Sequence, residues 1–301
     1  MKTLRSSIKL LIILIISSCN LDEDSHTLNS TRSLKVIKKD YYTNNILTSS
    51  KKNNFSSDKL INIQYNNGNY YNIYYEGDLV SKILEFNANN QLQWTRAYSY
   101  NSYGKLTQKK ITPGPALRKQ YVEGQKDIVY DGNLVTHIDS WSDGSRESKN
   151  ITSFDNEGLI LEHNELNAHN ITAFQNIYEY QNDNLVSRIR KTYNTIRTEE
   201  TYNYLDKKSS KEYRYIEYLF GSHWRINSFL DNEIMGLYNY EIYEVSDNYI
   251  SNHYYFDHTT NISVTSTFSY EFDSNDYITK QTKNTNSEGS IYKTITTYEY
   301  E

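Results

Sequence analysis

The stretch that decides the fold is YDGNLVTHIDSW, residues 130–141. Its Asp-Gly-Asn triplet favours a tight reversal, because these residues tolerate positive φ or form local side-chain turns. The residues after the turn alternate in character, as in a strand with two different faces. Related stretches occur as YYEGDLVSKILEF at 74–86 and YEYQNDNLVSRIR at 178–190. The sequence therefore predicts a β-hairpin that is repeated along the chain.

The spacing of these stretches supports a repeat. When the units are aligned on the apolar residue after the turn, successive copies lie 27, 28, 25 and 26 residues apart, at Leu79, Leu106, Leu134, Leu159 and Leu185. Two later copies, at Tyr249 and Tyr277, lie 28 residues apart. Many units begin with two tyrosines separated by one residue, which places both rings on one face of a strand. The alignment blurs over residues 190–235.

The strand after each turn follows the pattern Leu-Val-Ser/Thr-basic-Ile, at Leu79–Ile83, Leu134–Ile138 and Leu185–Ile189. In the second copy His137 occupies the basic position. Strict alternation predicts that Leu, Ser/Thr and Ile share one face of the strand, and that Val and the basic residue share the other.

The predicted fold class is all-β, an antiparallel meander of repeated hairpins. About 14 strands are expected, and an open sheet of that size must coil, split or close because strand twist accumulates. We expect a curled sheet or a wide, partly open barrel with tyrosines on its inner face. Both prolines lie in TPGPA, residues 112–116, which marks the longest clear loop between units.

The N-terminus predicts export. Three basic residues, Lys2, Arg5 and Lys9, precede an apolar run from Leu10 to Ile16, and small residues follow. This is the pattern of a signal peptide, here residues 1–18. The run is too short for a lasting transmembrane helix, which needs roughly 20 apolar residues.

The end of this leader resembles the lipobox of bacterial lipoproteins, with Ile16-Ser17-Ser18 before Cys19. The resemblance implies that Cys19 becomes lipidated and attaches the protein to a membrane. The acidic residues Asp22–Asp24 resemble the signal that sends lipoproteins of Bacteroidetes to the outer face of the outer membrane; the alternative is a solvated linker. We therefore expect an exported, surface-exposed outer-membrane lipoprotein.

The chain after the leader divides into two expected parts. Residues 19–57, from the lipidated cysteine onward, are rich in Ser, Asn, Lys and Asp and should form a mostly flexible tether, although Ser33–Tyr42 could add a strand. Residues 58–301 should form the repeat domain.

The repeats resemble the YD repeats of the Rhs family, and particularly the YD-repeat lipoproteins of Bacteroidetes. The resemblance rests on Tyr-x-Tyr, a Gly/Asn/Asp turn and Leu-x-x-Ile, and it covers roughly residues 61–301. Tyr130-Asp131, Phe272-Asp273 and Gly104–Leu106 come closest to the family's usual unit. We do not expect the long shell and C-terminal toxin of a full Rhs protein in a sequence of 301 residues. A weaker resemblance is to the short repeats of MORN-like antitoxin proteins.

Composition excludes several function classes. The formal net charge is −5 with both signs interspersed, so a nucleic-acid partner is not expected. No P-loop, GxGxxG or GxSxG motif occurs, and we expect no cofactor. The seven histidines show no strong metal-ligand spacing, so no metal site is predicted. His253 and His258 should point to opposite faces of a strand.

One cluster could carry chemistry. The stretch EHNELNAH contains Glu162, His163, Glu165 and His169. These residues would be the candidates if the protein were a surface hydrolase with its site on loops of the repeat scaffold. A solvated connecting segment is the alternative, and no catalytic residue is assigned.

The preferred function is a non-enzymatic binding module for a glycan or a protein. The chain has 31 tyrosines, and adjacent aromatic residues must face opposite sides of a strand. Exposed rings of this kind can stack on sugars or anchor a partner. The candidate binding aromatics are Tyr70, Tyr71, Tyr74, Tyr75, Tyr254, Tyr255 and Phe256. A structural role in the envelope is the other alternative.

Overall fold

The computed structural model describes residues 33–57, 59–118, 120–144, 147–210, 213, 224–230 and 246–301. The chain divides into two compact units, Met1–Arg32 and Ser33–Glu301, and all described residues belong to the second. The predicted signal peptide, the lipidation at Cys19 and the acidic residues after it lie outside the described residues.

The described residues form eighteen strands and a helix. The elements are β1 Leu34–Thr43, β2 Ile46–Ser56, β3 Lys59–Tyr65, β4 Tyr70–Glu76, β5 Leu79–Phe86, β6 Leu92–Tyr100, β7 Leu106–Pro113, β8 Gly124–Asp131, β9 Leu134–Trp141, β10 Glu147–Phe154, β11 Ile160–Leu166, β12 Thr172–Gln181, β13 Asn184–Thr192, β14 Thr195–Lys208, α2 Trp224–Leu230, β15 Asn248–Asp257, β16 Ile262–Phe272, β17 Ile278–Ser287 and β18 Ser290–Tyr300.

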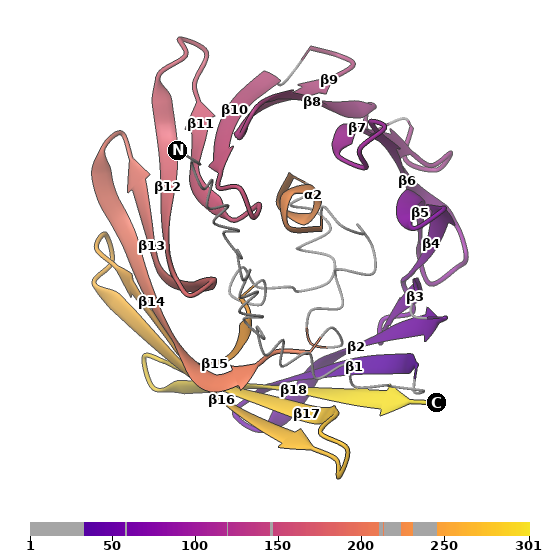
Figure 1. Cartoon of the computed structure of the whole chain (residues 1–301). Coiled ribbons are helices and arrows are strands. Elements are labelled where there is room, and N and C mark those ends of the chain that lie inside the picture. The colour runs from indigo at the N-terminus through magenta and orange to yellow at the C-terminus, as the bar shows by residue number, and fades with distance from the viewer. Residues whose placement is uncertain are drawn as a thin grey trace, which may run out of the picture. The chain divides into compact units, whose positions relative to one another are not determined.

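The strands form one closed antiparallel barrel. Each strand pairs with the next in the chain, and β18 pairs with β1, so the sheet returns to its beginning (Figure 1). The prediction of an all-β antiparallel meander is confirmed, and the sheet closes fully. Closure satisfies the backbone groups that the two edges of an open sheet would leave unpaired.

The expected tether between residues 33 and 57 is wrong. Leu34–Thr43 and Ile46–Ser56 are β1 and β2, and the alternative that Ser33–Tyr42 adds a strand is the correct one. The polar composition misled the prediction because Lys39, Lys51 and Asn53 are buried side chains of these strands. The barrel has eighteen strands where about 14 were expected, and β1 and β2 account for two of the additional ones.

At one end of the barrel, tyrosine side chains link neighbouring strands, and we call this the tyrosine end. The β4–β5, β6–β7 and β8–β9 turns lie at this end. Here tyrosine hydroxyls donate to backbone carbonyls of the preceding strand at 2.7–2.9 Å: Tyr75 to Leu60, Tyr100 to Val80, Tyr130 to Leu106, Tyr204 to Leu185, Tyr270 to Ile250 and Tyr300 to Ile278. Each of these bonds joins one hairpin to its neighbour. The repeated tyrosine therefore fixes the contact between units.

This arrangement predicts a measurable cost when one hydroxyl is removed. Tyr100→Phe should lower the free energy of unfolding by about 1 kcal/mol, because the carbonyl of the fully buried Val80 loses this donor. Tyr103→Phe, at a turn where the ring is 77% exposed, is the control and should change it by less than about 0.5 kcal/mol. Chemical denaturation measures both; equal effects would contradict the role of the buried bond.

A β-bulge follows the turn in most hairpins at this end. In the β4–β5 pair the register shifts between Tyr74 and Tyr75. The extra residue on β5 places Val80 and Ile83 on the same inner face, where both are fully buried. The sequence prediction that Val and Ile face opposite sides is therefore wrong in this unit.

The β8–β9 hairpin differs, because its register is continuous along the whole pair. Strict alternation therefore holds in β9. Leu134 and Ile138 face outward and are exposed, whereas Val135 and His137 face inward and are buried. The missing bulge places a histidine inside the barrel at the level where β5 has an isoleucine.

Helix α2 lies inside the ring of strands (Figure 1). It belongs to the long connection between β14 and β15, within the region where the repeat blurs. The buried Asn227 accepts from the backbone nitrogen of Leu106 at 2.8 Å and donates to the carbonyl of Gly104 at 2.9 Å. These bonds hold α2 at the tyrosine end of the lumen. No helix in the described part of the chain has the length and apolar character to cross a bilayer.

Candidate functional site: a polar cavity in the lumen

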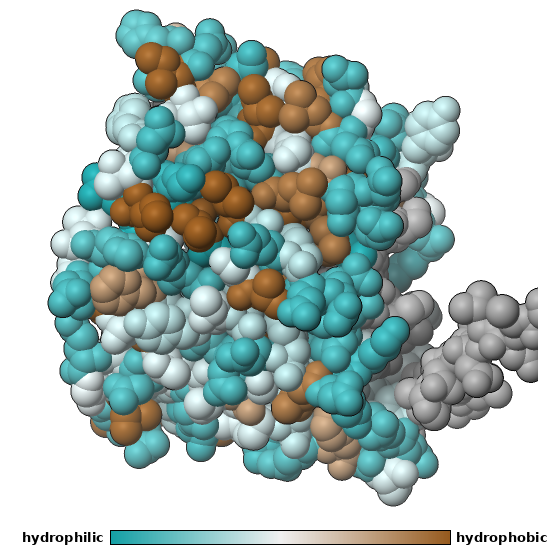
Figure 2. Space-filling model, turned by 60° about the vertical axis from the view of Figure 1, so that its left-hand side comes forward, coloured by the Kyte–Doolittle hydropathy of each residue, from teal (hydrophilic) through white to brown (hydrophobic). Residues whose placement is uncertain are grey.

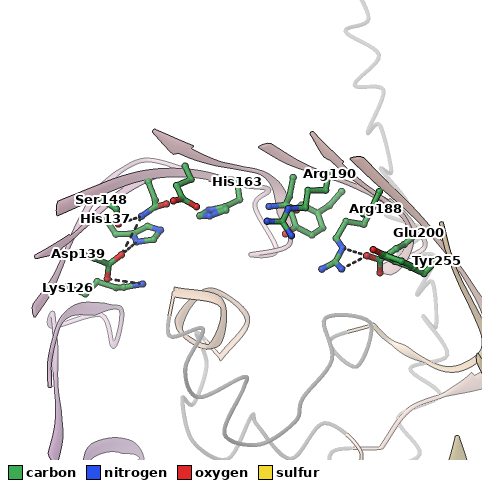
Figure 3. A pocket seen from close by; sticks show the side chains of 14 residues that line it. Lys126, His137, Asp139, Ser148, His163, Arg188, Arg190, Glu200 and Tyr255 are labelled. Carbon is green, nitrogen blue, oxygen red and sulfur yellow. Dashed lines mark hydrogen bonds and ion pairs between the residues drawn. The ribbon is translucent and has the colours of Figure 1, made fainter. Parts of the chain in front are cut away.

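A cavity of about 480 Å³ lies in the lumen, and we call it the lumenal cavity. Strands β8 to β15 form its wall, and Figure 3 shows the side chains that surround it. The lining residues are Lys126, Arg188 and Arg190; Asp139, Glu165 and Glu200; His137 and His163; and Ser148, Asn150, Asn176, Tyr178, Thr198 and Tyr255. Every lining residue therefore has a polar or charged side chain, and the volume of the cavity lies in the usual range of about 300–1,000 Å³ for small-molecule sites.

The cavity has a buried side, which we call its floor, and an exposed side. His137, Asn150 and Glu200 are 4%, 6% and 4% exposed, whereas Glu165 and Arg190 are exposed. Exposure therefore rises along the strands away from the tyrosine end, which indicates that the cavity opens at the opposite end of the barrel. On the buried side, the Lys126 ammonium donates to the carbonyl of Leu230 in α2 at 3.1 Å.

Asp139 organises one half of the wall. Its carboxylate lies 3.5 Å from the Lys126 ammonium and accepts from the Asn150 amide at 3.4 Å. Burial alone would raise the pKa of Asp139, but the neighbouring His137 and Lys126 outweigh burial and hold the pKa below its ordinary value. Asp139 is therefore an ionised hydrogen-bond acceptor at neutral pH.

His137 and His163 stack beside this carboxylate, with ring centroids 5.8 Å apart and planes at 19°. Burial lowers the pKa of His137, and burial together with His137 and Lys126 lowers the pKa of His163 to about 4. The Thr152 hydroxyl lies 2.9 Å from Nδ1 of His163. Both rings are therefore neutral at pH 7, and each has one donor and one acceptor nitrogen.

His137 is also poorly satisfied. Neither of its ring nitrogens has a hydrogen-bond partner among the described residues. The nearest carboxylate oxygen, on Asp139, lies 3.7 Å from Nδ1, which is too far for a hydrogen bond. A buried polar group left in this state costs about 1–3 kcal/mol, and such groups in native proteins call for an explanation.

Glu200 organises the other half of the wall. It accepts from the Arg188 guanidinium at 3.0 Å and from the Tyr202 hydroxyl, and His253 Nε2 lies 3.0 Å from its second oxygen. Burial would raise the pKa of Glu200, but His253, Arg188 and Tyr202 together lower it to about 2. The Tyr202 and His253 rings stack 4.9 Å apart and complete this cluster.

Two of the four residues in the EHNELNAH stretch line the cavity. His163 and Glu165 point into it from β11. Glu162 lies on the other face of the strand, where it accepts from Gln175 and Asn164. His169 lies in the exposed turn after β11. The four residues therefore do not form one site.

The candidate aromatics divide between the two faces of the barrel. Tyr71, Tyr75 and Tyr255 face inward, and Tyr255 lines the lumenal cavity. On the outside, Tyr70 stacks on Phe86, Tyr74 lies under Lys82, and Phe256 contacts His258 edge to face. Tyr254 is 43% exposed on β15. Because β4 and β15 are not neighbours, the outward rings do not form one continuous strip.

The predicted opposition of His253 and His258 is confirmed. His253 contacts Glu200 inside the barrel, whereas His258 lies 3.2 Å from Glu199 on the outside. No group of three His, Cys, Asp or Glu residues in the described ranges could hold a metal ion.

Sequence reasoning missed Lys126, Asp139, Arg188 and Glu200 as site residues. They lie on β8, β9, β13 and β14, and no local motif joins them. The two-residue alternation of inward and outward side chains could have indicated them, because charged residues at inward positions of neighbouring strands lie side by side in a closed barrel.

No family model matches the chain, and no curated protein matches it. Among solved structures, a porin-like protein from Bacteroides uniformis ATCC 8492 is 12% identical over 89% of this chain and 98% of that chain, with a TM-score of 0.49. A porin-like protein from Bacteroides vulgatus ATCC 8482 is 13% identical with the same coverages and a TM-score of 0.41. The TcdB2-TccC3 structure is 10% identical over 81% of this chain but 14% of that chain, with a TM-score of 0.34. The resemblance to YD-repeat proteins therefore rests on the sequence motifs.

Proposed function

We propose that the protein is an exported, lipid-anchored, non-enzymatic binding protein that holds a small polar ligand in its lumenal cavity. The observation that carries this proposal is a cavity of about 480 Å³ with a polar wall and a buried floor. Amide, hydroxyl, imidazole and carboxylate groups from eight successive strands converge on it. Two tyrosines, Tyr178 and Tyr255, add ring faces to the wall.

The protonation states favour binding over catalysis. A general acid or base works best when its pKa lies near the working pH. In this cavity the pKa of His163 is lowered to about 4, that of Glu200 to about 2, and those of His137 and Asp139 are also lowered. These groups keep fixed protonation states at neutral pH, which suits a site that presents constant hydrogen-bond donors and acceptors.

The outer surface supports a tethered barrel rather than one that spans the bilayer. Ionisable side chains pair on the outside of the barrel along the arc from β14 to β1: Lys38–Asp40, Lys280–Glu271 and His258–Glu199. A lysine or arginine on the lipid face of a barrel costs about 2–4 kcal/mol at the bilayer midplane. Hydrophilic and hydrophobic residues are interspersed on the outer face in Figure 2. Attachment through Cys19 needs no lipid-facing band.

The proposal predicts that filling the lumen abolishes binding. Thr198 lines the cavity from β14, and Thr201 on the same strand is exposed on the outside. Thr198→Trp should remove binding, because the indole occupies ligand volume, whereas Thr201→Trp should bind as the wild type does. Calorimetry on detergent-solubilised full-length protein measures this with a panel of neutral sugars, uronic acids, amino sugars and amino acids.

Circular dichroism checks that both variants are folded. If no panel compound binds the wild type, or if the two tryptophan variants bind equally, the lumenal cavity is not the binding site. A structural role in the envelope would then be the better reading.

A further inference from the structure

The charge of the lumenal cavity restricts the ligand it can hold. Three basic side chains, Lys126, Arg188 and Arg190, face three acidic ones, Asp139, Glu165 and Glu200, and the two histidines add no charge. Lys126 contacts Asp139, and Arg188 contacts Glu200. The formal charges of the wall therefore sum to zero, and two of its three positive charges are paired with a neighbouring carboxylate.

A charged ligand would gain little in this cavity. It would lose its hydration on entering the buried part of the lumen, where Lys126, Asp139, Arg188 and Glu200 already have partners of opposite charge. A charged ligand that replaced one partner of the Lys126–Asp139 or Arg188–Glu200 pair would leave the other partner as an uncompensated charge in the cavity. An uncharged ligand avoids both costs.

The buried floor is suited to hydroxyl groups. His137 is neutral and 4% exposed, and its nitrogens have no hydrogen-bond partner in the described part of the chain. A neutral imidazole has one donor and one acceptor, and a hydroxyl can serve either. A carboxylate could only accept and an ammonium could only donate. Asn150 and Tyr178, both also buried, provide further donors and acceptors beside it.

The position of His137 results from a local departure from the repeat. The β8–β9 hairpin has no register shift, so position 137 faces the lumen and Ile138 faces outward. In β5, where the bulge is present, Ile83 occupies the inner face instead. The hairpin that breaks the pattern is therefore the one that provides the polar floor.

We propose that the ligand of the lumenal cavity is an uncharged saccharide of one or two rings, whose hydroxyl groups bond to His137 at the floor. This inference rests on the proposed function and names its ligand class. Because both ring nitrogens of His137 are buried, this contact requires the ring to turn about its Cβ–Cγ bond when the ligand binds. Tyr178 and Tyr255 offer ring faces against which a sugar ring can pack.

The test compares sugars that differ only in charge. Calorimetry on the detergent-solubilised full-length protein would use glucose, glucuronate and glucosamine, the corresponding galactose series, and the neutral disaccharides maltose and lactose. At least one uncharged sugar should bind, and it should bind at least about tenfold more tightly than its acidic or amino analogue.

Variants at the floor assign the contact. His137→Phe should weaken the binding of that sugar at least about tenfold, because the ring loses both nitrogens, and His137→Gln should restore part of it, because the amide both donates and accepts. Thr201→Trp is the matched control and should leave the affinity unchanged. Unfolding transitions measured on the same samples show whether each variant is folded.

The outcomes separate the two proposals. If a uronate or an amino sugar binds most tightly and Thr198→Trp abolishes that binding, the uncharged ligand class is overturned and the lumenal binding function stands. If folded His137→Phe binds the neutral sugar as tightly as the wild type does, the assigned contact is wrong. If none of these compounds binds in a way that Thr198→Trp abolishes, both proposals fail.

Discussion

Glu200→Gln should lower the free energy of unfolding by about 3 kcal/mol, because it leaves the Arg188 guanidinium without its counter-charge. The Glu200 carboxylate is buried and also accepts from Tyr202 and contacts His253. Hydrogen bonds to a charged group contribute more than neutral ones, so the loss extends beyond the ion pair. The variant should remain a barrel, since no backbone pairing is changed.

Glu199→Gln is the matched control. Glu199 is adjacent on the same strand but faces outward, where its carboxylate contacts the partly exposed His258. Exposed pairs of this kind contribute roughly 0–1 kcal/mol. Urea denaturation at pH 7 measures both variants. A loss at Glu200 no larger than that at Glu199 would mean that the buried cluster does not stabilise the fold.

Acidification from pH 7 to pH 4 should destabilise the barrel by about 3 kcal/mol through His163 alone. Its pKa is lowered from 6.5 to about 4, mainly by burial and then by His137 and Lys126. Between these two pH values the unfolded chain binds a proton that the folded chain does not. Stability therefore falls as the pH drops from 6.5 to about 4. His137, whose pKa is also lowered, acts in the same direction.

The stability that Glu200 contributes is lost over a different pH range. Its pKa is lowered from 4.5 to about 2, so its share of the stability is lost below pH 4.5. His163→Gln should therefore flatten the stability profile between pH 6.5 and 4 and leave the more acidic part unchanged. His169→Gln, in an exposed turn, is the control. An unaltered slope in the His163 variant would contradict the assignment.

The hairpin repeat could be predicted because each unit carries its own local signals. Asp131-Gly132-Asn133 and its relatives define the turns, and paired tyrosines define the strand before them. Full closure could not be predicted in the same way, since it depends on pairing between the first and last strands. The strand β1 was also difficult to predict from its polar composition, because polar residues such as Lys39 are buried in the barrel.

The face of each residue was harder to predict than the strand that contains it. A bulge adds one residue and reverses every later side chain on that strand. Leu79–Ile83 and Leu134–Ile138 have nearly the same sequence, yet the bulge is present in the first and not in the second. Strict alternation correctly predicted that His137 and Ile138 lie on opposite faces of β9, but local sequence did not reveal which face is the inner one or that β5 would differ.

The candidate site could be predicted only in part. His163 and Glu165 stood out because they are close together in the sequence, and both line the cavity. Arg188 and Glu200 come from different strands and are brought together by cross-strand pairing. A motif search cannot detect such a site, because its residues are neighbours across adjacent strands and not along the sequence.

The pairing of β1 with β18 has a consequence for folding. The backbone nitrogen of Glu301 donates to the carbonyl of Ser33 at 3.1 Å, and β18 pairs with β1 along nearly its whole length. Ring closure therefore joins the first and the last of the described strands, which are the two that lie farthest apart in the sequence. Until β18 has joined the sheet, a partly folded barrel has two open edges that can pair with other polypeptides. The pairing of β18 with both β17 and β1 removes both edges.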